Sequence, residues 1–277
     1  MASGFHGPVY ATEATCALLE LVQPVPFHQS IPLDGVAATW RPAGHLLGSA
    51  FLEVDLGAEA ARPRLVFSGD LGRYDSEVMK PPPKIEDCDV LLLESTYGDR
   101  VHADQSIAQE LSRLLGEVAE SKGVLLIPAF AVGRTQQVLY HIRALQEAGL
   151  SASGMLTGGR ILHHLKWRLP EARNTVLFVG YQAEGTRGRA LLEGAKSLRV
   201  HGDQVTVRAQ IAQVDALSGH AGQDELLRWL GGLRRPPSQV YLVHGEPPAS
   251  QELERQIGSR LGYRTSIASE GMTVELK

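Results

Sequence analysis

The stretch Val90-Leu91-Leu92-Leu93-Glu94-Ser95-Thr96-Tyr97-Gly98-Asp99 is a run of apolar residues that closes on a carboxylate. Residues 90–94 predict a β-strand with Glu94 at its end. Because the strand is fully apolar, we expect Glu94 to be partly buried, and a buried charge needs a partner. This stretch therefore predicts a strand whose end carries a paired carboxylate.

Short β-rich runs of this kind alternate with helical stretches along the chain, and the alternation predicts an α/β protein. We expect strands at residues 36–40, 50–56, 64–67, 90–94, 124–127, 176–179, 205–209, 240–244 and 265–268. We expect helices at residues 104–121, 134–148, 160–169, 223–230 and 248–261.

The composition is that of an ordinary globular protein, with 277 residues, 43% hydrophobic and 21% charged. This length suits one large domain or two modest ones. The longest apolar run, residues 124–132, is far shorter than the roughly 20 residues that cross a bilayer, so no membrane partner is expected. Cys16 and Cys88 make no disulfide framework, and residues 1–8 do not resemble a secretory signal. We therefore expect a cytoplasmic location.

The net charge of -4 does not by itself indicate a nucleic-acid-binding protein. Residues 153–208, however, contain nine Lys or Arg and four Asp or Glu, a local net charge of +5. Such a segment can form a face that attracts phosphate, and it can equally be the solvated surface of helices.

Five residues suited to metal or acid–base chemistry lie at predicted strand ends or glycine turns: His45, Asp70, Glu94, His220 and His244. Each has an ordinary structural explanation, such as a core histidine or an Asx-turn beside glycine. Five in one chain favour a functional site, because α/β hydrolytic sites are assembled on loops held by a rigid sheet. A mixture of imidazole and carboxylate suits zinc or a similar metal.

Several motifs resemble, in order, those of the β-CASP nucleases, which are metallo-β-lactamase-fold enzymes that cut RNA and include RNase J. The motifs are Ala43-Gly44-His45-Leu46-Leu47-Gly48-Ser49-Ala50, Ser68-Gly69-Asp70-Leu71-Gly72, Glu94-Ser95-Thr96-Tyr97-Gly98-Asp99-Arg100, Ser218-Gly219-His220-Ala221-Gly222 and His244-Gly245-Glu246. Pro128-Ala129-Phe130-Ala131-Val132-Gly133-Arg134, the segment 153–160 and Gly180-Tyr181-Gln182-Ala183-Glu184-Gly185-Thr186 are similar to the inserted β-CASP domain. The resemblance implies an αββα metallo-β-lactamase sandwich at 1–100 and 210–277, with a shortened β-CASP α/β domain at 101–209.

The resemblance also implies a role for each matching residue. His45 would bind one zinc, Asp70 would bridge two zincs, and His244 would bind the second. Glu94 and His220 would act with Asp70 in catalysis, with His220 as the candidate general acid. Residues implied to face the RNA backbone are Arg134, Ser153, Gly154, Met155 and Arg160. Helix starts and glycine-rich turns present backbone N–H groups to phosphate, which is consistent with this role.

The chain departs from the family in one respect. The leading His-x-His-x-Asp-His signature, which supplies most zinc ligands, has no counterpart, since no two of the ten histidines are spaced as His-x-His. Residues 4–12 resemble a segment that follows that signature. Abrupt joins near residues 21–23, after an apparent helix at 14–22, and near residues 150–151 also suggest shortening. We therefore interpret the chain as a family member shortened in three places.

Two functions remain open from the sequence. The first is a zinc-dependent ribonuclease that binds one ion weakly or none, where complete relatives bind two, and whose catalysis is impaired or depends on a partner. A homodimer or a complementing chain would supply what is missing and would cover any sheet edge or apolar face left exposed. The alternative is a non-catalytic RNA-binding or assembly module derived from such a nuclease. Ester or lactam hydrolysis on the same fold is less favoured, although fold alone does not decide function.

Overall fold

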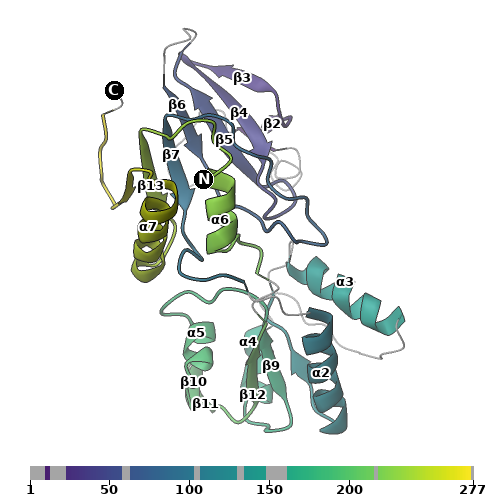
Figure 1. Cartoon of the computed structure of the whole chain (residues 1–277). Coiled ribbons are helices and arrows are strands. Elements are labelled where there is room, and N and C mark those ends of the chain that lie inside the picture. Colours follow the sequence, from purple (N-terminus) through teal and green to yellow (C-terminus); the bar gives the residue numbers. More distant parts are fainter. Residues whose placement is uncertain are drawn as a thin grey trace. The chain divides into compact units, whose positions relative to one another are not determined.

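The computed structural model describes residues 10–12, 23–57, 63–102, 107–129, 134–147, 161–214 and 218–275 (Figure 1). The chain divides into two compact units. The first unit combines Met1–Val101 with His220–Lys277, and the second is His102–Gly219. All five residues of the expected metal and acid–base site belong to the first unit.

The first unit is built on a seven-stranded mixed sheet. Its strand order is β14-β13-β7-β6-β5-β4-β3. The strands from β3 to β6 pair antiparallel, and those from β6 through β7 and β13 to β14 pair parallel. The bounds are β3 Ser30–Leu33, β4 Val36–Pro42, β5 Ala50–Asp55, β6 Arg64–Phe67, β7 Val90–Glu94, β13 Gln239–Val243 and β14 Thr265–Ile267. A separate parallel pair joins β1 Tyr10–Thr12 to β2 Gln23–Val25.

Two helices contribute to the core of this unit, α6 Gln223–Leu230 and α7 Pro247–Leu261 (Figure 1). One core cluster contains alternate residues of the central strands together with side chains of α6 and α7: Leu91, Leu93, Val240, Leu242, Leu226, Trp229, Leu253 and Ile257. Alternate strand residues point to one face, so this pattern packs one face of the sheet against the helices. The parallel strands β6, β7 and β13 therefore have their carboxyl ends fixed at one edge, where the loops with the candidate residues begin.

The second unit contains a three-stranded parallel sheet of order β12-β9-β8 and a β10–β11 hairpin. Its strands are β8 Leu125–Leu126, β9 Thr175–Phe178, β10 Ser197–Val200, β11 Asp203–Thr206 and β12 Gln210–Gln213. Its helices are α2 Ile107–Glu120, α3 Arg134–Glu147, α4 Ile161–Arg168 and α5 Arg187–Leu192. Two buried clusters fill the unit, and successive residues of β9 alternate between them: Val176 and Phe178 belong to one and Leu177 belongs to the other.

The α/β prediction is confirmed, and each of the five predicted helices overlaps an observed one within two or three residues where the chain is described. The strand expected at 205–209 is wrong in its bounds, since the observed strand is Asp203–Thr206. The pairing of Ser197 with Thr206 sets that register, and the partner strand Ser197–Val200 was not predicted. The apparent helix at 14–22 lies outside the described residues. Among the described helices, none combines the length and apolar character that a bilayer span requires.

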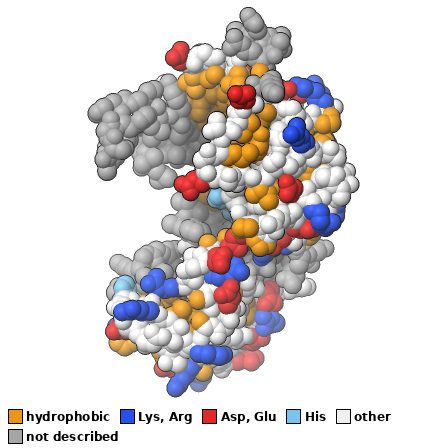
Figure 2. Space-filling view, turned by 90° about the vertical axis from the view of Figure 1, so that its left-hand side faces the viewer, with side chains coloured by type: hydrophobic (Ala, Val, Ile, Leu, Met, Phe, Trp, Pro, Cys, Tyr) orange, Lys and Arg blue, Asp and Glu red, His pale blue; other side chains and the backbone are white. Residues whose placement is uncertain are grey.

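Both units expose large hydrophobic side chains, among them Trp167 in the second unit. Hydrophobic side chains gather on the upper part of the face drawn in Figure 2, which belongs to the first unit. Three large hydrophobic side chains of the C-terminal stretch are exposed: Ile267, Met272 and Val274. Lys and Arg side chains are spread over the second unit in the same view. A partner that covered these apolar side chains would remove them from water. A second copy of the chain is one such partner, and the homodimer stays a prediction.

Candidate active site

Glu94 is the most buried member of the site, with a side chain only 1% exposed. Its two oxygens accept hydrogen bonds from different parts of the chain. Oε1 accepts from the backbone N–H of Leu71 at 2.5 Å, and Oε2 accepts from the hydroxyl of Thr96 at 2.8 Å. The backbone N–H of Glu94 donates to Oγ of Ser68 at 2.9 Å. The expected burial and partnering of Glu94 are therefore present in detail.

His220 is the partner that the sequence could not identify from spacing alone. Its Nδ1 atom lies 3.0 Å from Oε2 of Glu94. An ionised carboxylate accepts hydrogen bonds and donates none, so this contact places the imidazole proton on Nδ1. The other ring nitrogen, Nε2, then lacks a proton in the neutral imidazole and gains one in the imidazolium form. The pair has the arrangement of an acid–base histidine oriented by a buried carboxylate.

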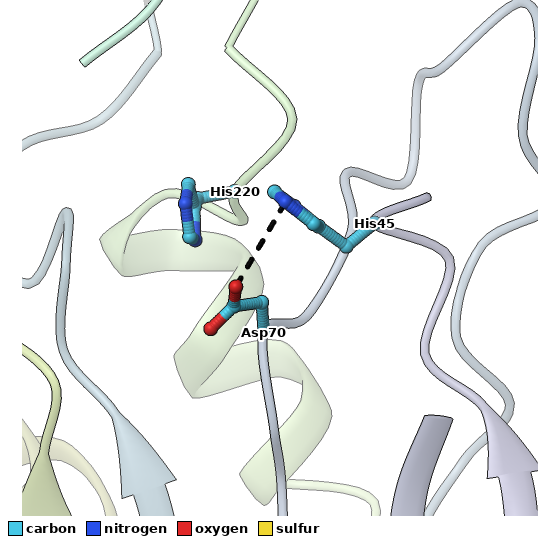
Figure 3. A group of neighbouring side chains, drawn as sticks. All are labelled: His45, Asp70 and His220. Carbon is cyan, nitrogen blue, oxygen red and sulfur yellow. Dashed lines mark ion pairs between the residues drawn. The ribbon is translucent and has the colours of Figure 1, made fainter. Parts of the chain in front are cut away.

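Asp70 lies between the two other histidines, with one oxygen directed to each. Its Oδ2 lies 3.9 Å from Nε2 of His45, and its Oδ1 lies 3.2 Å from Nδ1 of His244. Figure 3 shows Asp70 and His45 converging, with the ring of His220 beside them. The ring centroids of His45 and His220 are 4.3 Å apart. Asp70 and His244 keep exposed side-chain fractions of 40% and 60%, so a substrate can reach this part of the site.

Backbone contacts between three loops hold these side chains together. The N–H of Gly72 donates to the carbonyl of Ala43 at 2.7 Å, and the N–H of Ala221 donates to the carbonyl of Leu71 at 2.8 Å. A Cβ atom on Gly72 would lie 2.0 Å from the carbonyl oxygen of Gly44, so only glycine permits this approach. The glycines of these motifs therefore bring the loop with His45 against the loop with Asp70.

His244 follows directly after β13 and adopts φ = +57°, a left-handed conformation that is uncommon for a residue with a side chain. The sequence placed it as the last strand residue, but the strand ends at Val243. Such conformations persist where the surroundings impose them, and they cluster at functional sites. The next residue, Gly245, approaches β7 so closely that a Cβ there would lie 2.5 Å from the carbonyl oxygen of Ser95.

The donor set of these residues fits a metal site. Among the described residues there are two groups of three possible ligands, and within each group the ligand atoms lie within 4.8 Å of one another. One group is His45, Asp70 and His220, and the other is Asp70, Glu94 and His244. Both groups share Asp70, whose two oxygens face opposite histidines, and imidazole with carboxylate is a ligand set that zinc accepts. Glu94 suits a ligand role less than the others, because its oxygens already accept hydrogen bonds from Leu71, Thr96 and His220.

The residues implied to face RNA are less fully described. Arg134 begins α3 in the second unit, and its side chain is outside the described residues. Ser153, Gly154, Met155 and Arg160 also lie outside the described residues. Their roles stay predictions.

Sequence reasoning missed Thr96, although it lies in the quoted stretch. Its side chain is almost fully buried, and its hydroxyl lies near both Glu94 and His244. A hydroxyl two residues after a strand-end carboxylate was the available signal, since short polar side chains commonly bond to neighbouring groups at such positions.

Comparison with known proteins agrees with the mixed α/β fold. Residues 204–268 match the family described as the Zn-dependent metallo-hydrolase RNA specificity domain, and residues 145–191 match the Beta-Casp domain. The chain is 31% identical to Ribonuclease TTHA0252 of Thermus thermophilus over 361 positions, covering 97% of this chain and 82% of the relative. It is 27% identical to an RNase J-like protein of Methanocaldococcus jannaschii, covering 83% and 68%.

A third relative is transcription termination factor FttA of Methanocaldococcus jannaschii, at 26% identity, of which the chain spans 55%. The alignment with the Thermus thermophilus ribonuclease is longer than the chain itself, so that relative has internal segments without counterpart here. The mixed α/β fold and the imidazole–carboxylate cluster are consistent with the class of Zn-dependent metallo-hydrolases that residues 204–268 match. Within that class, the chain belongs to the β-CASP family of metallo-β-lactamase-fold ribonucleases.

Proposed function

We propose that this chain hydrolyses RNA with His220 as the general acid that protonates the leaving oxygen and Glu94 as the carboxylate that orients it. The contact of 3.0 Å between His220 Nδ1 and the buried Glu94 Oε2 carries the proposal. With Nδ1–H held by Glu94, His220 in its imidazolium form carries a second proton on Nε2, and this is the proton that would pass to the leaving oxygen. The RNA specificity match supports RNA as the substrate.

His45, Asp70 and His244 are the proposed zinc ligands. Zinc bound there would supply an activated water and would neutralise charge on the phosphate. Asp70 contributes to both groups of ligand atoms, so its substitution affects whichever group holds the ion. The site is open on the side of Asp70 and His244, which leaves room for a phosphodiester.

We further propose that the chain alone holds one zinc weakly and cleaves RNA slowly. His45 and His244 do not share a ligand group, since they lie on opposite sides of Asp70. A catalytic zinc takes three protein ligands. Each group reaches three only by including His220 or Glu94, and these two residues form the acid–base pair. A homodimer or a complementing chain would supply the remaining ligands.

The second unit is the proposed RNA-binding part of the chain and corresponds to the β-CASP domain. The basic segment 153–208 and the start of α3 at Arg134 support this assignment, because cationic side chains and helix starts attract phosphate. A cytoplasmic location is part of the same proposal.

The test compares His220→Ala with the parent chain in two assays on one single-stranded RNA, cleavage with added zinc and binding by fluorescence anisotropy. We expect His220→Ala to lose cleavage by at least about 100-fold and to keep its affinity for RNA, because general acids contribute about 10²–10⁴ in rate. His28→Ala, at an exposed position of the first unit between β2 and β3, is the matched control and should keep both activities. A parent chain that binds RNA without cleaving it would instead support the non-catalytic binding module.

A further inference from the structure

Thr96 lies at the junction between the acid–base pair and the proposed metal ligands. Its hydroxyl oxygen is 2.8 Å from Oε2 of Glu94, 3.2 Å from the carbonyl oxygen of His244 and 3.4 Å from Nδ1 of His244. A hydroxyl has one proton, and the shortest contact is to the charged acceptor, so Thr96 donates to Glu94. Thr96 is 6% exposed, so water does not readily replace this donor.

The position follows from the register of two parallel strands. Glu94 at the end of β7 pairs with Val243 at the end of β13. The residues that follow the two strands therefore lie close together. The hydroxyl of Ser95 donates to the carbonyl of Val243 at 2.9 Å, and the hydroxyl of Thr96 lies beside His244. Ser95 also contacts Ser250 in the interior, whereas Thr96 faces the site. Two consecutive hydroxyls thus join the strand ends, and only the second contacts residues of the site.

The two donors to Oε2 of Glu94 act on the same atom. One is Thr96, and the other is Nδ1–H of His220 at 3.0 Å. Without Thr96, the carboxylate keeps the backbone N–H of Leu71 as its anchor on Oε1 and can rotate about its terminal bond. The hydrogen bond that fixes the tautomer of His220 would then be loosened.

We propose that Thr96 is a positioning residue for the acid–base pair. Its hydroxyl fixes the orientation of Glu94, and Glu94 in turn holds the proton of His220 on Nδ1. The same hydroxyl lies beside His244, so Thr96 stands between the acid–base pair and the metal-ligand side of the site. This role rests on the proposed function, since it concerns the same site, but its first readout is independent of catalysis.

The experiment uses the full chain with ¹⁵N-labelled histidine, free of metal, at a pH above the ordinary imidazole pKa of about 6.5. The imidazole ¹⁵N signals of His220 report which nitrogen carries the proton. We expect the parent chain and Thr96→Ser to show the Nδ1–H form alone. Thr96→Val keeps the volume and removes the hydroxyl, and we expect it to show both tautomers. An unchanged His220 signal in Thr96→Val would overturn the proposal.

Kinetics provide the second readout, if the parent cleaves RNA. Thr96→Val should lower kcat by about 10- to 100-fold, the usual effect of losing an outer partner of an active-site group, and leave KM within about 3-fold. Thr96→Ser should restore kcat. An unchanged kcat in Thr96→Val would also overturn the proposal. A parent chain that cleaves no RNA removes the proposed function, while the tautomer measurement still decides the role of Thr96.

Ser95→Ala is the matched control, because it removes the neighbouring hydroxyl that joins the same two strand ends. It should lower the melting temperature without changing the His220 signals. If Ser95→Ala changed the His220 signals as Thr96→Val does, general loosening of the strand ends would explain both, and the specific role of Thr96 would be refuted.

Discussion

His220 and Glu94 are 126 positions apart in the sequence, yet Nδ1 of the one lies 3.0 Å from Oε2 of the other. The carboxylate is buried at the end of a central strand, and the histidine lies on the loop before α6. A rigid sheet holds the first and backbone bonds to the loop of residues 71–72 hold the second. The pair is therefore preorganised before any substrate arrives.

The first prediction concerns the charge of Glu94. Glu94→Gln keeps the shape but offers one acceptor oxygen in place of two, so either Leu71 or His220 loses its acceptor. We expect kcat for RNA cleavage to fall by about 100-fold with a smaller change in KM. Glu120→Gln, at the exposed end of α2, is the control. A Glu94→Gln chain with parental kcat would show that His220 needs no orienting carboxylate.

Much of this pair was predictable. Glu94 could be placed at a strand end because the run before it is apolar, and His220 could be placed at a loop before a helix. Their contact could be expected only from the family resemblance, since it depends on how separate loops meet. The contribution of the Leu71 N–H could not be predicted, because a hydrogen bond from a backbone group leaves no mark in residue type, whereas the Thr96 hydroxyl was a signal in the sequence that was missed.

The glycines illustrate the same limit. The sequence marked Gly72 as a turn residue, but its close approach to Gly44 follows from the packing of two loops. In the second unit, the hairpin β10–β11 was missed because Ser197–Val200 is short and polar at two of its four positions. Pairing with a neighbour, which sequence pattern does not reveal, decides such strands.

A second prediction concerns the metal ligands. Asp70 belongs to both ligand groups, whereas His45 and His244 belong to one each. Asp70→Asn should therefore abolish zinc binding to the isolated chain, and either histidine substitution alone should weaken it less. Zinc per chain after chelator treatment, reconstitution and dialysis measures this. Zinc retained by Asp70→Asn at the parental level would mean that the ion binds elsewhere.

The third prediction concerns the packing of the loops. Gly72→Ala places a Cβ 2.0 Å from the carbonyl oxygen of Gly44, so we expect a loss of about 1–3 kcal/mol in the free energy of unfolding. Gly116→Ala on α2 meets no atom within 4 Å and should gain about 0.5–1 kcal/mol. Denaturant unfolding of both variants gives the comparison. Equal effects from the two substitutions would contradict the proposed close approach.

The fourth prediction concerns Cys88, which is buried in the core of the first unit. Burial, with the nearby charges of Asp87 and Asp89, raises the pKa of its thiol to about 12. The reactive thiolate is therefore scarce at any pH well below that value. In a Cys16→Ser chain, a thiol reagent at pH 8 should modify Cys88 slowly in the native state and fully in denaturant. Rapid native-state modification would contradict this burial.

The most direct test of metal-dependent RNA hydrolysis is the initial rate of cleavage of one single-stranded RNA by the chelator-treated full chain, measured against added zinc. We predict a rate that starts at the background level, rises with zinc and saturates, and that stays at background throughout for His220→Ala. Cleavage that is independent of zinc, or equal in parent and His220→Ala chains, would contradict the proposed mechanism.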